Sequence, residues 1–265
     1  MGVWTPFFFV VLAATRCAHN EDMRQSTSNT SVGPDESDPV TLARVTGKTG
    51  GDLVLRRVGA HYEIYSNGVF LMDTRDGTSE REMVRASLAA LAPGRSLARV
   101  LIGGLGVGFS AREALDHPRV ARVDVVELEP LVIDWHEEEL GEAAGYVHRD
   151  PRCRVHNADI VTWLEETVKA PEPPRYEVIC LDTDNGPDWT VADNNERLYQ
   201  QDGLEQLSRI LAPGGVLSFW SANAVPAFEE LLRSRFTRVE IIEVPVARGV
   251  PDVVYLAGRP HDTAG

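Results

Sequence analysis

The 265-residue chain has few cysteines and no recognisable metal-binding or phosphate-binding motif. Its three cysteines, Cys17, Cys153 and Cys180, are scattered, which gives neither a disulfide framework nor a metal-ligand spacing. The seven histidines are scattered as well, so we expect no metal site. Nothing resembles a nucleophile elbow or a phosphate-binding loop with its lysine. These absences argue against a disulfide-stabilised module, a metalloenzyme and a phosphate-loop nucleotidase.

Basic side chains are also in deficit. The 26 Lys and Arg residues face 40 Asp and Glu residues, for a formal net charge of −14. An acidic surface repels phosphate backbones, so we expect no nucleic-acid partner. The same charge is compatible with a cationic substrate such as an amine, although solubility alone also accounts for it.

The N-terminus carries an apolar run, residues 6–14, that has signal-peptide length and is too short to span a bilayer. No Lys or Arg precedes it, and Arg16 fits poorly in front of Cys17 as a lipoprotein cleavage site. We therefore expect a cytoplasmic protein without a membrane span, while the signal-like residues 1–18 leave export or lipid anchoring open. Residues 19–41 are polar and predict a disordered linker.

Residues 42–78 alternate between polar and apolar and predict a small antiparallel β unit of two to four strands. A helix is expected from about Ser79 to Ala92, with Ser79 as its N-cap. Strands and helices then alternate through residues 79–260, which predicts βαβ units and a parallel sheet. The segments 239–244 and 253–257 predict a closing antiparallel strand pair at one edge, and residues 261–265 form a tail.

A glycine-rich turn, Gly103 to Gly108, follows the first strand of the βαβ region and opens a helix. Glycines there let the backbone turn sharply and approach a nucleotide closely. Glu127 ends the next strand, where an acidic side chain accepts hydrogen bonds from ribose hydroxyls; a surface carboxylate is the plainer alternative. Asp159, after the third strand, is a candidate for the adenine amino group, for a helix N-cap, or for both.

An acidic loop runs from Asp182 to Asp188, directly after the apolar strand 178–181, and Trp189 follows it. Ligands of open α/β sheets lie outside the carboxyl ends of the strands. A cationic ligand would relieve the repulsion among these acids, and one carboxylate could accept a proton. The alternative is a turn built from Asp, Asn, Gly and Pro. Trp189 is expected either to line the acceptor pocket or to pack in the core.

In this order, the motifs resemble the spermidine synthase (polyamine aminopropyltransferase) family, a branch of the class I S-adenosylmethionine-dependent methyltransferase fold. The resemblance runs from about Gly51 to Ala257. The segments that carry it are Asn67 to Met83, Gly103 to Gly108, Val125 to Pro130, Tyr176 to Asp182, and Leu198-Tyr199. It implies an α/β fold with a doubly wound, mostly parallel seven-stranded sheet (Rossmann-like), a small N-terminal antiparallel β unit, and a homodimer formed through that unit.

The resemblance also implies a role for each matching position. The residues implied to bind the donor, S-adenosylmethionine or its decarboxylated form, are Gly103, Gly104, Gly106, Gly108, Glu127 and Asp159. The implied catalytic residues are Asp182 and Asp184, with Asp182 beside the sulfonium and the attacking amine. The implied acceptor-binding residues are Glu80, Asn185, Trp189 and Tyr199. No metal is implied.

The chain departs from the family pattern at positions that bind the substrates in the family. Gly106 stands where the family's glycine motif has an acid, Leu71 replaces a glutamine, and Glu80 replaces a tyrosine. The family's acidic loop is shortened, so its second acid is either Asp184 by a shift or is replaced by Asn185. These changes argue against ordinary aminopropyl transfer to putrescine, and Glu80 offers a carboxylate to another cationic acceptor.

The sequence therefore predicts a transferase that moves an aminopropyl or methyl group from (decarboxylated) S-adenosylmethionine to a nucleophile, an amine above all. Two alternatives stay open: a methyltransferase with an unknown acceptor, and a catalytically inactive nucleoside-binding homologue. The acidic loop and the closing strand pair disfavour an NAD-dependent oxidoreductase.

Overall fold

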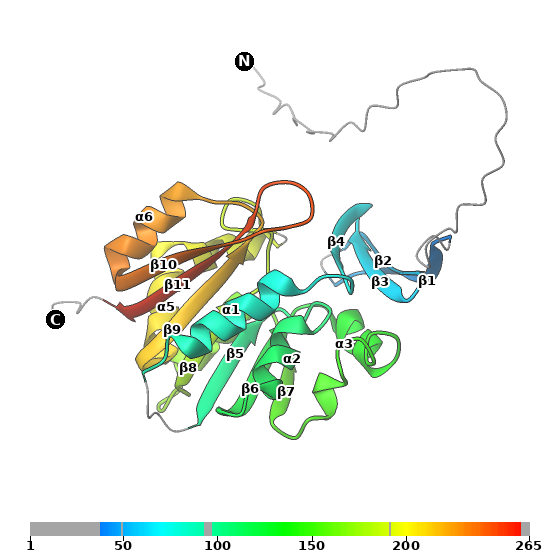
Figure 1. Ribbon diagram of the computed structural model, residues 1–265. Helices are drawn as coiled ribbons and strands as arrows, with labels where there is room; N and C mark the ends of the chain where they lie inside the picture. Colours follow the sequence, from blue (N-terminus) through cyan, green and yellow to red (C-terminus); the bar gives the residue numbers. More distant parts are fainter. Residues whose placement is uncertain (1–37, 49, 93–96, 191, 261–265) are drawn as a thin grey trace, which may run out of the picture. The chain divides into compact units, whose positions relative to one another are not determined.

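The computed structural model describes residues 38–48, 50–92, 97–190 and 192–260 (Figure 1). The signal-like segment 1–18, most of the expected linker 19–41 and the tail 261–265 lie outside the described residues. None of the described helices has both the length and the apolar composition that crossing a membrane requires.

The N-terminal part of the described chain is a four-stranded antiparallel sheet in which sequence neighbours pair. Its strands are β1 Val40–Thr46, β2 Asp52–Val58, β3 His61–Ser66 and β4 Val69–Asp73. Asn67 and Gly68 both have positive φ, 52° and 78°, which is the type I′ turn that an Asn-Gly pair favours between hairpin strands. The β unit starts at Val40, so the predicted linker boundary at residue 41 is two residues too late.

The second sheet has seven strands in the order β10-β11-β9-β8-β5-β6-β7. The strands are β5 Ala98–Gly103, β6 Val120–Glu127, β7 Cys153–Asn157, β8 Tyr176–Leu181, β9 Leu211–Ser221, β10 Phe236–Val244 and β11 Asp252–Pro260. Strands β5 to β9 pair in parallel, and β10 and β11 add antiparallel strands on the β9 side. The predicted seven-stranded, mostly parallel sheet and its closing strand pair are confirmed.

Within the described residues, six α-helices cover this sheet in two layers (Figure 1). They are α1 Thr78–Ala89, α2 Phe109–Asp116, α3 Pro130–Glu137, α4 Ile160–Val168, α5 Gln201–Ile210 and α6 Pro226–Arg235. Apolar side chains of α1, α2 and α3 form one buried cluster, and those of α4, α5 and α6 form another. Central strands are buried on both faces, so Val100, Leu101 and Ile102 form a continuous apolar run. The fold is therefore doubly wound.

The start of α1 differs from the prediction that Ser79 caps a helix ending at Ala92. The helix begins at Thr78 and ends at Ala89, with Gly77 at the N-cap position and no side-chain cap. Asp76 accepts hydrogen bonds from the amide and the hydroxyl of Thr78, at 2.9 and 2.6 Å. Ser79 lies inside the first turn and donates instead to Glu80 Oε2, at 3.0 Å. The capping prediction was wrong because the helix starts one residue earlier.

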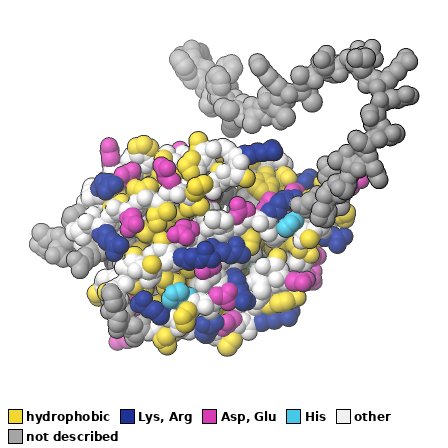
Figure 2. All heavy atoms as spheres, viewed as in Figure 1, with side chains coloured by type: hydrophobic (Ala, Val, Ile, Leu, Met, Phe, Trp, Pro, Cys, Tyr) yellow, Lys and Arg dark blue, Asp and Glu magenta, His cyan; other side chains and the backbone are white. Residues whose placement is uncertain are grey.

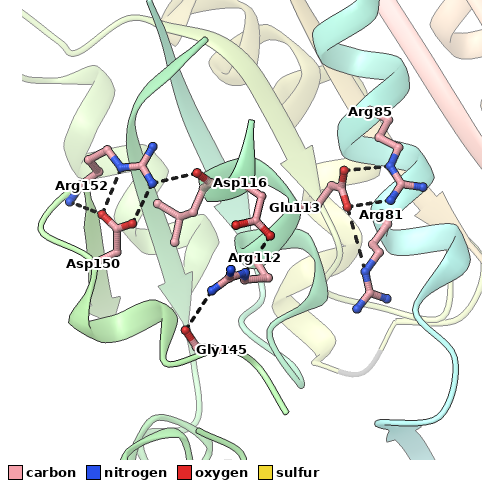
Figure 3. Close-up of polar contacts among 9 residues, drawn as sticks. Arg81, Arg85, Arg112, Glu113, Asp116, Gly145, Asp150 and Arg152 are labelled. Atoms are coloured by element: carbon pink, nitrogen blue, oxygen red, sulfur yellow. Dashed lines mark hydrogen bonds and ion pairs between the residues drawn. The ribbon is translucent and has the colours of Figure 1, made fainter. Parts of the chain in front are cut away.

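Ion pairs fix α2, the helix that follows the glycine turn. Arg85 of α1 donates through two nitrogens to Glu113 of α2, at 2.8 and 2.9 Å, and Arg81 lies 4.0 Å from the same carboxylate (Figure 3). Arg112 of α2 pairs with Asp116 at 2.7 Å. On the visible surface acidic and basic side chains are interspersed, so the net charge is not gathered there in one patch (Figure 2).

Candidate active site

A cavity of about 200 Å³ lies where the strand order reverses, at the carboxyl ends of β5 and β8. This is the position at which open α/β sheets bind ligands. Side chains of β3 and β4 line its other side. Most of the predicted site residues meet here, namely Gly104, Gly106, Gly108, Glu127, Asp159, Glu80, Asp182, Asp184 and Asn185.

Three predicted site residues do not line this cavity. Gly103 ends β5, and a Cβ there would lie 2.8 Å from Leu181 Cδ2, so it serves the packing of two strands. Tyr199 is buried behind the cavity, where its hydroxyl donates to Asp184. Trp189 is 58% exposed and is not among the lining residues of either cavity described here, so it does not pack in the core.

The glycine turn approaches the end of β8 closely. Gly104 has φ +90°, and a Cβ there would collide with the carbonyl oxygen of Asp182. The Asp182 amide in turn donates to the Gly103 carbonyl at 2.9 Å. Only glycine satisfies both the positive φ and the close approach, so this position fixes the backbone beside Asp182.

Gly106, which replaces the family's acid, faces Met72 of β4. A Cβ at Gly106 would lie 3.2 Å from the Met72 Sδ atom, and Leu71 lines the same cavity. Met72 therefore occupies the space into which a side chain at this position would extend. The exchange of an acid and a glutamine for Gly106 and Leu71 makes this part of the wall apolar.

Glu127 is buried at the end of β6 and holds the glycine turn. Its Oε2 accepts the Leu105 amide at 2.8 Å, and its Oε1 accepts the Glu129 amide at 2.7 Å. Burial raises its pKa, and the backbone amides counteract part of that rise. A carboxylate has about four acceptor sites, so both oxygens can still receive ribose hydroxyls.

Asp159 is the N-cap that one of its two expected roles requires, and it also lines the cavity. It is the N-cap of α4, where its side chain accepts the Thr162 amide at 2.8 Å. It also accepts from Asn194 Nδ2 at 3.0 Å and lines the cavity.

Asp182 directly follows β8 and lines the cavity together with Glu80. Its Oδ2 accepts the Ser110 hydroxyl at 3.0 Å. Burial, together with the negative charges of Glu80 and Asp252, raises the pKa of Asp182 to about 7. Burial also raises the pKa of Glu80 and of Asp252, and the charge of Asp76 adds to both. The three carboxyls therefore lie close enough to disfavour one another's ionisation.

A second cavity of about 260 Å³ lies next to the first, since the two share lining residues. The shared residues are Leu71, Met72, Glu80 and Trp220. Its further acidic residues are Asp73, Asp76 and Asp252. No Lys, Arg or His is among the described residues that line either cavity.

Asp184 has a different environment from Asp182. It is buried and accepts the Tyr199 hydroxyl at 2.9 Å, Asn195 Nδ2 at 3.0 Å and the Thr183 hydroxyl at 2.9 Å. With these donors on its carboxylate, Asp184 is suited to hold the loop after β8 against the chain around residue 199.

Sequence reasoning missed Ser110, Met72, Trp220 and Asp252. Each lies far along the chain from Asp182; Met72 belongs to the segment Asn67 to Met83, and the other three belong to no motif that the sequence analysis identified. Only Asp252 could have been suspected of lying at the site. It starts β11, and its neighbour Val253 pairs with Ser221 at the end of β9.

A family model described as the spermine/spermidine synthase domain matches residues 79–234, more than half of the chain. A polyamine aminopropyltransferase 2 of Streptomyces coelicolor is 35% identical over 162 residues, which are 56% of this chain and 28% of that protein. A polyamine aminopropyltransferase of Mycobacterium tuberculosis is 29% identical over 206 residues, which are 78% of this chain and 36% of that protein. The chain thus spans about a third of the length of these curated relatives.

Solved structures share the fold. Spermidine synthase from Thermotoga maritima has a TM-score of 0.64 at 16% identity, and a spermidine synthase in complex with the transition state analogue AdoDATO has 0.63 at 17%. Both matches cover 83% of this chain and 72% of the other. Human methyltransferase-like protein 13 in complex with SAH has a TM-score of 0.55 at 19% identity, covering 70% of this chain and 84% of that one. The resemblance seen in the motifs is confirmed, and the chain belongs to the spermine/spermidine synthase family.

Proposed function

We propose that the protein transfers an aminopropyl group from decarboxylated S-adenosylmethionine to an amine with two or more ammonium groups. One observation carries this proposal. Two neighbouring cavities are lined by Glu80, Asp182 and Asp252, and no Lys, Arg or His is among the described residues that line them. Such a site favours cations at every subsite.

The same charges select the form of the donor. Intact S-adenosylmethionine carries a carboxylate, which needs a cationic or hydrogen-bonding partner to be buried. The decarboxylated form carries only positive charge, and each positive charge near Asp182 relieves the repulsion that raises its pKa. The apolar wall of Leu71 and Met72 suits the methylene groups of an aminopropyl chain.

The nucleoside half of the cavity fits the same donor. Glu127 supports binding of the ribose hydroxyls, Asp159 supports contact with the adenine amino group, and Gly104 lets the backbone approach. The polyamine aminopropyltransferases related to this chain support the same class of reaction.

Asp182 acts as the proton acceptor in this proposal. Its pKa of about 7 is close to the working pH, which is the range for an effective general base. Asp182 takes a proton from the acceptor ammonium, and the freed nitrogen forms a bond to the propyl carbon next to sulfur. The carbon–sulfur bond breaks, and its electron pair stays on the sulfur of methylthioadenosine. The sulfonium leaves readily, so the protein mainly aligns the reactants.

The second cavity holds the far ammonium group of the acceptor. Asp76 and Asp252 supply negative charge there, whereas Asp73 is paired with Arg75 at 2.6 Å, and Trp220 also lines this cavity. Glu80 lies at the junction of the two cavities, so it contacts the middle of the acceptor in place of the family's tyrosine.

We also propose that the protein is a homodimer through its N-terminal sheet. Val69 and Phe70 of the edge strand β4 are 49% and 48% exposed, which supports an apolar contact. Light scattering on the full chain tests this, and a monomer mass would contradict it.

The test of the function is product analysis on the full chain with each donor and a panel of diamines, triamines and tetraamines. The proposal expects amine-dependent release of methylthioadenosine and an acceptor heavier by one aminopropyl group. Methylated product from the intact donor alone would instead make the protein a methyltransferase. Nucleoside binding without either product would make it an inactive homologue.

A further inference from the structure

The glycine turn contains a peptide unit whose direction the rest of the turn does not determine. The Gly108 amide donates to the Leu105 carbonyl at 2.9 Å and closes a four-residue turn with Gly106 and Val107 at its centre. Gly106 has φ +51°, whereas Val107 is not among the described non-glycine residues with positive φ. This pattern is that of a type II′ turn. In such turns, the central peptide can rotate while the closing hydrogen bond stays in place.

His136 holds that central peptide. It lies on α3, is 0% exposed, and its Nε2 donates to the Gly106 carbonyl at 2.9 Å. A carbonyl only accepts, so the Nε2 atom bears the proton. The ring also packs under the turn, because a Cβ at Gly108 would lie 2.9 Å from its Cε1 atom. His136 does not line the cavity itself.

The other ring nitrogen of His136 indicates that packing alone does not account for a histidine at this position. Its Nδ1 atom is buried and has no hydrogen-bond partner among the described residues. A buried, unpaired acceptor is unfavourable, so a histidine here is a poor choice for packing alone. Burial lowers the pKa of His136, which keeps the ring neutral with the single proton that the Gly106 carbonyl requires.

The hydrogen bond has a consequence on the cavity side of the turn. In a trans peptide, the carbonyl and the following N–H point in opposite directions. Holding the Gly106 carbonyl toward α3 therefore directs the Val107 N–H away from His136. Val107 lines the cavity, and no described carbonyl or side chain accepts its N–H. That N–H is free for an acceptor atom of a bound nucleoside.

We propose that His136 is a positioning residue for the donor nucleoside, which it serves by fixing the Gly106–Val107 peptide from behind the cavity. Glu127 holds the same turn from its other end, through the Leu105 amide. The inference rests on the proposed function only in that this cavity binds the donor.

Two variants of His136 distinguish a role in positioning the Gly106–Val107 peptide from a role in packing alone. His136→Phe keeps a flat ring but removes the donor, and His136→Gln keeps an N–H at a similar reach. We expect His136→Phe to weaken binding of methylthioadenosine, measured by calorimetry on the full chain, by about tenfold, the loss of one useful hydrogen bond. The donor KM should rise in parallel, while the acceptor KM and kcat at saturation stay near wild type. His136→Gln should recover most of the affinity.

Ser87→Ala is the matched control for stability. Ser87 is buried and bonds to Met83 and Ser218, and it does not line the cavity, so its loss lowers Tm without touching the turn. Unchanged methylthioadenosine affinity in His136→Phe would overturn the inference. Equal losses in the Phe and Gln variants that track their Tm values, as in Ser87→Ala, would reduce His136 to a packing residue.

A measurement on the unaltered protein remains decisive if His136→Phe does not fold. Nitrogen-15 NMR of histidine-labelled protein should show His136 protonated at Nε2 and should show a shift on addition of methylthioadenosine. A proton on Nδ1, or no shift with the ligand bound, would contradict the inference. If the wild type binds no methylthioadenosine, the proposed function itself fails, so the two failures are distinct.

Discussion

The carboxylates in the two halves of the cavity differ in the hydrogen-bond donors that surround them. On the nucleoside side, Glu127 accepts two backbone amides, and Asp159 accepts one backbone amide and one side-chain amide. On the acceptor side, Asp182 accepts the Ser110 hydroxyl, Glu80 accepts the Ser79 hydroxyl, and the side chains of Ser79 and Trp220 hydrogen-bond to Asp252. The first half is organised by the protein's own backbone. In the second half, burial and the neighbouring carboxyls raise the pKa values of Asp182, Glu80 and Asp252, and the proposed cationic acceptor would relieve that repulsion.

This difference explains why one half keeps the family pattern and the other departs from it. The carboxylate of Glu127 fixes the glycine turn as well as facing the cavity, so a change there disturbs the fold of the site. Leu71 and Glu80 contribute side chains to the cavity wall, and neither is hydrogen-bonded to the glycine turn among the described residues, whereas Gly106 has φ +51° and belongs to the turn itself. Under the proposed function, substrate choice can therefore vary at Leu71 and Glu80 without disturbing the glycine turn.

Asp182→Asn should have the largest effect, and it should affect the acceptor half of the cavity without affecting the nucleoside half. The variant keeps the size of the side chain but removes the proton acceptor, so turnover should fall by about 10²- to 10⁴-fold. Methylthioadenosine binding should remain near wild type, because the nucleoside half is intact. Turnover and calorimetry on the same preparation measure both, and turnover at the wild-type rate would remove Asp182 from the mechanism.

Glu127→Gln should affect the opposite half. An amide group cannot accept at both positions, so either the Leu105 or the Glu129 amide loses its partner. Donor affinity should fall by roughly 10- to 100-fold, the value of hydrogen bonds to a charged group. The acceptor KM should change little.

Glu137→Gln is the control for that experiment, since Glu137 is an exposed residue of α3 that lines neither cavity. A Glu127→Gln protein that binds the donor as tightly as this control would contradict a backbone-organised nucleoside half.

Glu80→Gln tests, through the pH dependence of kcat/KM, whether the carboxyls of Glu80 and Asp182 interact. In the wild type, kcat/KM should rise as pH increases through about 7, because Asp182 must lose its proton to act as a base. Removing the charge of Glu80 removes one cause of the raised Asp182 pKa, so the acidic limb should move to lower pH. The acceptor KM should rise by roughly tenfold. A pH profile identical to wild type would show that the two carboxyls do not interact.

The smallest effect is expected for Trp189→Ala. Its side chain is 58% exposed and lines neither cavity, so kcat and both KM values should stay within about twofold of wild type, as for most surface substitutions. A large change in the acceptor KM would show that the acceptor half extends to the loop after Asp188.

The parts of the site that the sequence predicted are those with local signals. The glycine turn, Glu127, Asp159 and Asp182 each follow an apolar strand, and parallel strands bring their carboxyl ends to one edge. Trp189 also followed a strand end, yet the loop carries it to the surface. Its neighbours along the chain gave no indication of that outcome.

The residues that the sequence did not reveal act across long separations. Asp252 reaches the acceptor half because β11 is inserted beside β9, a pairing that periodicity cannot specify. His136 contacts Gly106 because α3 packs behind the turn, and a lone histidine in a helix carries no sign of this. The Ser79 cap failed for a smaller reason, since Asp76 and the start of α1 at Thr78 left it inside the first turn.

The most direct test of the account is calorimetry with the full chain, comparing decarboxylated and intact S-adenosylmethionine at neutral pH. A cavity that offers carboxylates and no basic side chain among its described lining residues should bind the decarboxylated donor more tightly, by at least about tenfold. Tighter binding of the intact donor would contradict the cation-selective acceptor half and would favour methyl transfer instead.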